Sequence, residues 1–183
     1  MPNQEYDTKC YDKIFEEEFP DTFFISGGNA SEVRSDRFVL MASIEKIVRV
    51  VDVMRLIDRD DQSDSEIDER KSEGVRVLSR RNLESYLLDD EVLIALAQKA
   101  GHGDKINKVI ATKNRLIQFK KPGASDDLKP IAGELYNQCK NIFGLIRCGN
   151  NAKAFMQNTL APLIKPEMQI YKELKRDIFG TGA

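Results

Sequence analysis

Three carboxylates within four residues stand directly after an apolar run. The run covers residues 50–57, and Asp58-Arg59-Asp60-Asp61 follows it. In an extended segment, side chains two residues apart project to the same side, so we expect Asp58 and Asp60 to lie together. Two such carboxylates repel each other, and a divalent cation that prefers carboxylate oxygens, Mg²⁺ or Mn²⁺, relieves this repulsion. The alternative interpretation is an acidic turn that simply faces water.

A second charged group follows the next apolar run, residues 74–78. Arg80 and Arg81 carry guanidinium forks that match phosphate oxygens, so they are candidate phosphate contacts. Equally, they could only neutralise nearby aspartates. Glu84 could be a further metal ligand or a carboxylate beside the ligands. Its alternative role is that of a glutamate at a helix start, where it caps backbone donors or pairs with Arg80 or Arg81.

Charge is distributed unevenly along the chain. Residues 1–98 contain 13 Lys and Arg against 23 Asp and Glu, whereas residues 99–183 contain 15 against 7. The basic half includes a predicted helix with a stripe of cations: Lys105, Lys108, Lys113, Arg115, Lys120 and Lys121. Lys105 and Lys108 are therefore candidate contacts to a nucleic-acid backbone. An amphipathic helix with a lysine-rich solvent face is the competing interpretation.

Other kinds of chemistry have little support in the sequence. His102 is the sole histidine, which argues against histidine-rich zinc sites, and the three cysteines have no C-x-x-C pairing, which indicates reduced thiols. Gly27-Gly28 lacks the Lys-Ser/Thr of a phosphate-binding loop, so any ATP hydrolysis has to come from a partner. The polar start, Met1 to Glu5, does not resemble a secretory signal, and no apolar stretch approaches the roughly 20 residues that cross a bilayer. These features predict a cytoplasmic protein without a membrane segment.

The elements that must position these residues follow from apolar periodicity. Strands are predicted at residues 22–26, 50–57 and 74–78. Helices are predicted at residues 7–19, from about 29 to 48, and at 91–100, 104–119, 130–143, 151–163 and 166–179, with a loop and a solvated helix over 62–72. This order predicts an α/β fold, in which a small parallel sheet flanked by helices occupies residues 1–90 and a helical C-terminal region occupies 91–183.

The segment from Asp52 to Glu73, together with Val75 to Leu88, resembles the TOPRIM domains of OLD-family and related ATPase-associated proteins of prokaryotic defence. In that group a hydrophobic strand ends in Asp-x-Asp. A later strand leads into Arg-Arg-x-(Ile/Leu)-Glu-x-Tyr-Leu-Leu, which residues 80–88 match closely. Residues 171–174 and 178–180 are also similar to the same group.

The resemblance implies a TOPRIM fold and a magnesium-dependent nuclease. In it Asp58 and Asp60 take the paired positions, and Glu5, with Asp7 beside it, is the candidate for the first-strand glutamate. Here the sequence departs from the family, because only four residues precede Glu5 and the usual glycine is replaced by Tyr6. The resemblance further implies a nucleic-acid substrate and an ABC-type ATPase partner; homo-oligomer formation is left open. The alternative, motivated by the shortened start, is a non-catalytic TOPRIM-like binding or regulatory module.

Overall fold

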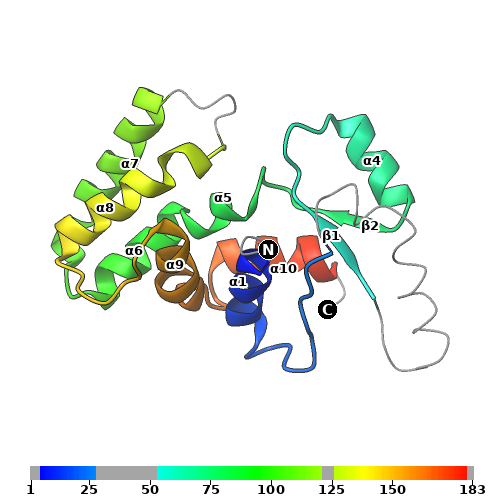
Figure 1. Ribbon diagram of the computed structural model, residues 1–183, viewed down its shortest axis with the longest axis horizontal. Coiled ribbons are helices and arrows are strands. Elements are labelled where there is room, and N and C mark those ends of the chain that lie inside the picture. Colours follow the sequence, from blue (N-terminus) through cyan, green and yellow to red (C-terminus); the bar gives the residue numbers. More distant parts are fainter. Residues whose placement is uncertain (1–4, 28–52, 121–125, 181–183) are drawn as a thin grey trace.

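Two short parallel strands form the sheet of this protein. In the computed structural model, which describes residues 5–27, 53–120 and 126–180, β1 (Arg55–Ile57) pairs in parallel with β2 (Val75–Val77), and Leu56 lies opposite Arg76. Helix α4 (Asp64–Ser72) forms the crossover between the strands (Figure 1). The predicted parallel pairing and the strand at 74–78 are therefore confirmed. Of the predicted run 50–57, β1 covers residues 55–57, and residues 50–52 lie outside the described ranges.

Helix α4 is defined by its cap rather than by an apolar face. The Ser63 hydroxyl accepts from the Glu66 amide, and the Glu66 carboxylate accepts from the Ser63 amide, which together make a capping box. The rest of the helix is mostly polar and exposed, as predicted for the solvated segment 62–72. Only Ile67 packs against the small core that Ile57 forms with β2.

The strand predicted at residues 22–26 is wrong: this segment is irregular. The side chains of Phe23 and Ile25 are 82% and 75% exposed, whereas Phe24 packs against Tyr11 and Phe15. The aromatic contacts of Phe24 therefore hold this segment against α1 (Tyr6–Phe15), in place of the expected strand pairing. Residues 28–52, with the helix predicted to end near 48, lie outside the described residues.

Helices make up most of the described chain, and the predicted helices after residue 90 are confirmed with shifted ends. They are α6 (Asp90–Lys99), η2 (Gly103–Lys105) continuing into α7 (Ile106–Lys120), η3 (Lys129–Ile131) continuing into α8 (Ala132–Phe143), and α10 (Gln169–Phe179). The helix predicted at 151–163 is divided into α9 (Ala152–Phe155), a π-helical turn η4 (Met156–Leu160) and a 3₁₀ turn η5 (Ala161–Leu163). Pro162 lacks an amide donor, which helps to explain why regular α-helix does not reach residue 163.

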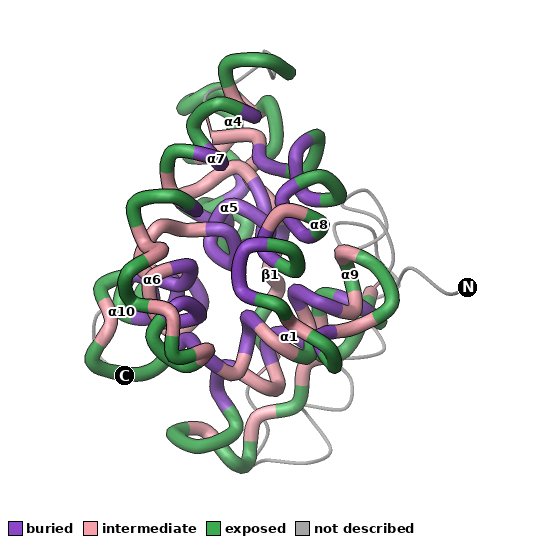
Figure 2. The backbone as a smooth tube through the Cα atoms, turned by 90° about the vertical axis from the view of Figure 1, so that its left-hand side faces the viewer, coloured by how far each residue is buried: buried purple, intermediate pink, exposed green. Residues whose placement is uncertain are grey.

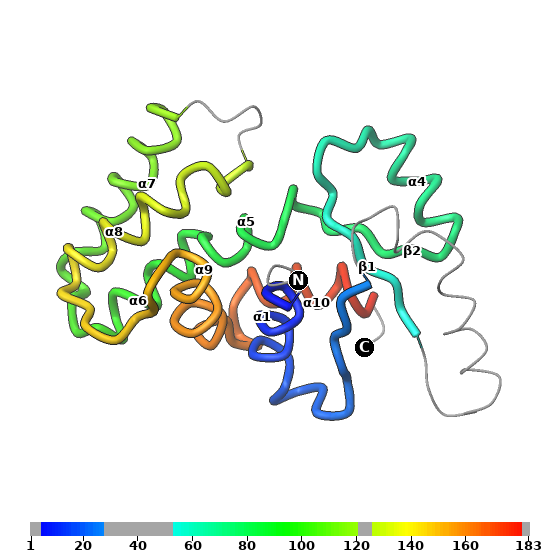
Figure 3. Tube along the Cα trace, in the orientation of Figure 1, coloured from blue at the N-terminus to red at the C-terminus, as the bar shows by residue number. Residues whose placement is uncertain are grey.

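The main core joins the first helix to the last. Helix α1 lies beside α10 (Figure 3). Phe15 contacts Tyr171 and Phe179, with ring centroids 5.2 Å apart in both pairs. The same core continues through α5 (Leu83–Leu87) into α6, α8 and η4, so it draws on residues on both sides of position 90. Figure 2 shows the buried positions of these elements turned toward the interior.

Among the helices of the described ranges, none is both long and apolar enough to cross a membrane.

Candidate functional site

Asp58 begins the turn that follows β1. The ladder ends where the Leu78 amide donates to the Ile57 carbonyl at 3.1 Å. Asp60 then adopts a left-handed backbone with φ of 47°, and its amide donates to the Arg81 carbonyl at 2.8 Å. The expectation that the chain stays extended as far as Asp60 is therefore wrong, because the chain turns at Asp60 to meet the segment after β2.

Lys129 joins two carboxylates from distant parts of the chain. Its Nζ lies 3.4 Å from Oδ2 of Asp58 and 3.8 Å from Oε2 of Glu84. Glu84 stands in the first turn of α5, which Asn82 caps by accepting from the Ser85 amide. The Glu84 side chain is only 10% exposed and that of Asp58 27%, so this is a partly desolvated cluster rather than a surface pair.

The charges in this cluster are not balanced. Burial raises the pKa of Asp58 to about 7, Lys129 opposes this rise, and Asp7, Asp60 and Glu84 add to it. Burial also raises the pKa of Glu84, again against Lys129 and with Asp7 reinforcing the rise. A single ammonium group therefore does not compensate the carboxylates around it.

Asp7, rather than Glu5, is the N-terminal carboxylate that joins this cluster. Asp7 is exposed, yet desolvation by the surrounding protein raises its pKa against the influence of Lys129 and Lys153. Glu5 is exposed and pairs with Lys9 at 2.7 Å, and it is not among the groups that shift the pKa of Asp58. The structure thus brings Asp7, Asp58, Asp60 and Glu84 into one electrostatic cluster, which we call the Lys129 cluster, and leaves Glu5 outside it.

Arg80 is committed to internal contacts. Its Nε and Nη2 donate to the two carboxylate oxygens of Glu173 on α10, at 3.0 and 2.9 Å, and its Nη1 donates to Asp89 at 2.7 Å. Its guanidinium carbon also lies 5.1 Å from the centre of the Tyr86 ring. Burial acts to lower the pKa of Arg80, but the hydrogen bonds to Glu173 and Asp89 raise it. A phosphate contact by Arg80 would require these bonds to break.

A second carboxylate of α10 holds the same loop. Asp177 Oδ2 accepts from the Ser79 hydroxyl and from the Tyr86 hydroxyl, both at 2.6 Å, and from the Ser79 amide at 2.9 Å. The Tyr86 hydroxyl in turn accepts from the Arg80 amide at 3.0 Å. The segment between β2 and α5 is therefore fixed to the last helix by a polar network, which in turn fixes the start of α5 and Glu84.

Arg81 has acidic neighbours on two sides. It lies 2.6 Å from Asp61 and 3.6 Å from Asp127, and its amide donates to Asp126 at 3.1 Å. These contacts match the interpretation in which Arg81 neutralises nearby aspartates. They also connect the turn after β1 to the segment that leads into Lys129.

Of the two lysines proposed to bind nucleic acid, one points inward. Lys105 donates from Nζ to the Ile142 carbonyl at 2.9 Å, and it therefore anchors η2 to the end of α8. Lys108 is exposed on α7.

The Lys129 cluster offers oxygen donors, the kind that Mg²⁺ and Mn²⁺ prefer, and its excess negative charge suits a hard cation. In the described ranges, however, no three His, Cys, Asp or Glu side chains converge closely enough to form a ligand set. Asp58 and Glu84, which Lys129 already joins, are the residues that would hold such an ion, and Asp7 of α1 acts on the pKa of both.

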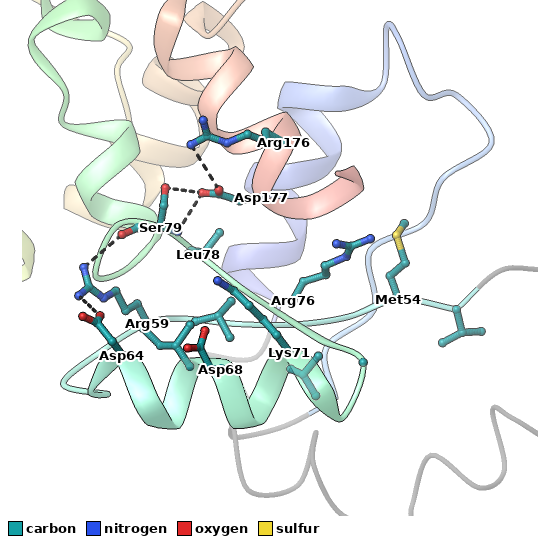
Figure 4. A pocket seen from close by; sticks show the side chains of 15 residues that line it. Met54, Arg59, Asp64, Asp68, Lys71, Arg76, Leu78, Ser79, Arg176 and Asp177 are labelled. Atoms are coloured by element: carbon teal, nitrogen blue, oxygen red, sulfur yellow. Dashed lines mark hydrogen bonds and ion pairs between the residues drawn. The ribbon is translucent and has the colours of Figure 1, made fainter. Parts of the chain in front are cut away.

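A cavity lies elsewhere, between α4, β2 and α10. Its volume is about 880 Å³, and Figure 4 shows Arg59, Lys71, Arg76 and Asp177 among its lining residues. Several of its charges are satisfied within the protein, since Arg59 pairs with Asp64 at 3.6 Å and Asp177 is occupied by Ser79 and Tyr86. This cavity does not include the Lys129 cluster.

The sequence reasoning missed Lys129. No local signal marks it, because its partners Asp58 and Glu84 lie 71 and 45 positions away.

A comparison of the chain with protein-family models, curated proteins and solved structures finds no match.

Proposed function

We propose that this chain is a divalent-metal-dependent phosphodiesterase that hydrolyses DNA or RNA, with a TOPRIM-type arrangement of its sheet and carboxylates. The observation that carries the proposal is the Lys129 cluster: where β1 ends, Lys129 lies 3.4 Å from Asp58 and 3.8 Å from Glu84, and the charges of Asp7 and Asp60 add to the burial that raises the pKa of Asp58 to about 7. Such an accumulation of negative charge is costly in a partly buried place, and functional sites are where proteins commonly retain it.

The chain's own residues divide the work as follows. Asp58 and Glu84 would hold the cation, and Asp7 would take the place that the resemblance to TOPRIM domains implies for Glu5. The chemistry that a bound Mg²⁺ or Mn²⁺ would supply there is polarisation of the scissile phosphate and a lowered pKa of an attacking water. Lys129 lies beside both carboxylates, so its ammonium group would be placed to pair with a phosphate oxygen of the substrate. Asp177 and Glu173 keep the loop before α5 in position.

The resemblance to OLD-family proteins extends the proposal to context. It suggests an ABC-type ATPase partner, a cytoplasmic location and a role in defence against foreign nucleic acid. The absence of a Walker-type sequence around Gly27-Gly28 supports a separate source of ATP hydrolysis.

A second candidate is a non-catalytic binding or regulatory module with the same fold. The observation that favours it is the ion pair between Lys129 and Asp58, which gives the carboxylate an internal counter-ion. In that case the carboxylates organise α5 and η3 and bind no metal.

A cleavage assay separates the two candidates. Purified chain is incubated with plasmid DNA, single-stranded DNA and RNA, each with Mg²⁺, Mn²⁺ or EDTA. A nuclease requires the metal, and Asp58→Ala should reduce cleavage by at least about a hundredfold, whereas Asp68→Ala on the exposed side of α4 should cleave like the wild type. Cleavage by Asp58→Ala at the wild-type rate contradicts the mechanism. No metal-dependent cleavage by a folded wild type favours the binding module.

A further inference from the structure

The exposed face of α7 has an unusual composition. The helix has 15 residues and contains no Asp or Glu. Its exposed positions recur at the spacing of one helical face and are Asn107, Lys108, Ala111, Asn114, Arg115, Gln118 and Phe119, followed by Lys120 at the end. We call this set the α7 face. It combines amides, cations and one aromatic ring without a single carboxylate.

The cations of α7 differ in their surroundings, as Lys113 on the same helix shows. Lys113 is buried and pairs with Asp90 of α6 at 2.7 Å, so it serves the packing between the two helices. Lys108, Arg115 and Lys120 have no carboxylate within 4 Å among the described residues, although the acidic half of the chain supplies many. Their charge remains available to an external anion.

Phe119 is the second observation. Its side chain is 79% exposed, next to Lys120 and one helical turn from Arg115. Other aromatic side chains that project from the helices pack inward, as Phe15 and Phe155 do. An exposed ring between two cations is the arrangement by which proteins stack an unpaired base while they neutralise the adjoining phosphates.

We infer that the α7 face binds single-stranded nucleic acid, with Phe119 stacking on a base and Lys108, Arg115 and Lys120 contacting phosphates. The inference refines the proposed function, on which it rests for the identity of the polymer, by specifying unpaired strands. A duplex hides the faces of its bases, so it could use the cations but not the ring. The amides at 107, 114 and 118 supply neutral donors along the same track.

The helix that carries the α7 face lies next to an element of the Lys129 cluster. Helix α7 contacts η3, the short helix that carries Lys129. The α7 face therefore belongs to a helix that packs directly against the element carrying Lys129. Lys108 and Arg115 are about 10 Å apart along the helix axis, at roughly 1.5 Å per residue, so the track spans more than one phosphate.

Fluorescence anisotropy with the full chain tests the inference. The probes are a labelled 20-nucleotide oligo-dT, an oligo-U of equal length and a mixed-sequence duplex, all in EDTA so that binding is measured without cleavage. We expect the single strands to bind more tightly than the duplex. Phe119→Ala should weaken single-strand binding about tenfold, and Phe119→Tyr should retain it, because base stacking contributes roughly 1–3 kcal/mol. Ile146→Ala removes an equally exposed apolar side chain elsewhere and should change nothing.

Salt dependence separates the cations from the ring. With three phosphate contacts, the logarithm of the affinity should fall with the logarithm of salt concentration with a slope of about −2. The double variant Lys108→Gln, Arg115→Gln should reduce that slope to about −0.7, whereas Phe119→Ala should leave it unchanged. All substituted positions are exposed, and circular dichroism with thermal melting verifies that each variant is folded.

Three results overturn the inference. The first is equal affinity for duplex and single strand with no effect of Phe119→Ala. The second is no oligonucleotide binding by the folded wild type. The third is self-association that Phe119→Ala abolishes, which would assign the α7 face to a second copy of the chain. The binding assay contains no metal, so it is independent of cleavage. If the wild type binds single strands but does not cleave nucleic acid, the proposed function fails and this inference stands. If the wild type cleaves nucleic acid but does not bind these oligonucleotides, this inference fails and the proposed function stands.

Discussion

Arg80 and Glu173 are 93 positions apart in the chain and meet as a two-pronged ion pair, with N–O distances of 3.0 and 2.9 Å. Arg80 follows β2 and Glu173 lies on α10, so the pair connects the sheet to the last helix. Both side chains are mostly shielded from solvent, with exposed fractions of 27% and 21%. The strong charge compensation is evident in Glu173, whose pKa burial tends to raise but Arg80 lowers.

This pair should be a principal determinant of stability. Arg80→Met leaves Glu173 and Asp89 without their cation, and we expect the free energy of unfolding to fall by about 3 kcal/mol. Arg80→Lys should recover only part of this loss, because an ammonium group cannot make the two parallel bonds. Urea denaturation measures both effects, and Lys172→Met on the exposed side of α10 is the control. A loss below about 0.5 kcal/mol for Arg80→Met contradicts the assignment.

The raised pKa of Asp58 predicts that replacing its carboxyl group increases the stability of the protein, and that the increase depends on pH. Its folded-state pKa of about 7 lies above the ordinary 3.8, so the stabilisation linked to its protonated form is complete below pH 4 and is lost as the pH rises through 7. Asp58→Asn does not ionise and should therefore be more stable than the wild type at pH 8, by roughly 1–4 kcal/mol, with a smaller difference at pH 5. Thermal or urea unfolding at both pH values measures this.

The control for this prediction is Asp68→Asn, which alters an exposed aspartate of α4 and should show no such pH dependence. An Asp58→Asn variant that is equally destabilised at pH 5 and pH 8 indicates that the ionised carboxylate contributes to folding instead of opposing it.

Two glycines should respond in opposite directions to alanine. Gly149 has a φ of 102°, and a Cβ there would lie 2.6 Å from the Phe155 amide nitrogen, so Gly149→Ala should destabilise the protein by at least about 2 kcal/mol. Gly133 is exposed within α8 and a Cβ there meets nothing within 4 Å, so Gly133→Ala should stabilise by about 1 kcal/mol. Differential scanning calorimetry compares the two. A Gly149→Ala variant that melts with or above the wild type is incompatible with this backbone geometry.

The helices and the second strand were predictable because local signals define them. Residues 166–179 show an apolar face at helical spacing, and in the structure Ile170, Tyr171, Leu174 and Ile178 are buried along α10. Residues 74–78 combine β-branched side chains with a preceding glycine, and they form β2. The segment 22–26 has the same kind of composition, but Phe23 and Ile25 face solvent, since apolar content alone does not supply a pairing partner.

The site was only partly predictable because its members come from separate elements. Asp58 follows from the apolar run that ends before it, and Glu84 from the similarity of residues 80–88 to a known motif. Lys129 and the preference for Asp7 over Glu5 depend on how η3 and α1 pack, and no local pattern encodes that. Arg80, a candidate phosphate contact by residue type, is instead held by Glu173, a partner that the sequence order does not reveal.

The central claim is that Asp58 and Glu84 hold a hard divalent cation in competition with Lys129, and calorimetric titration with Mn²⁺ and Mg²⁺ at pH 7.5 tests it most directly. We predict saturable binding to the wild type, affinity at least about tenfold lower for Asp58→Asn and for Glu84→Gln, and severalfold higher for Lys129→Gln, because a competing positive charge is removed. Asp68→Asn should bind like the wild type. No binding by folded wild-type protein, or binding that Asp58→Asn leaves unchanged, would contradict the claim.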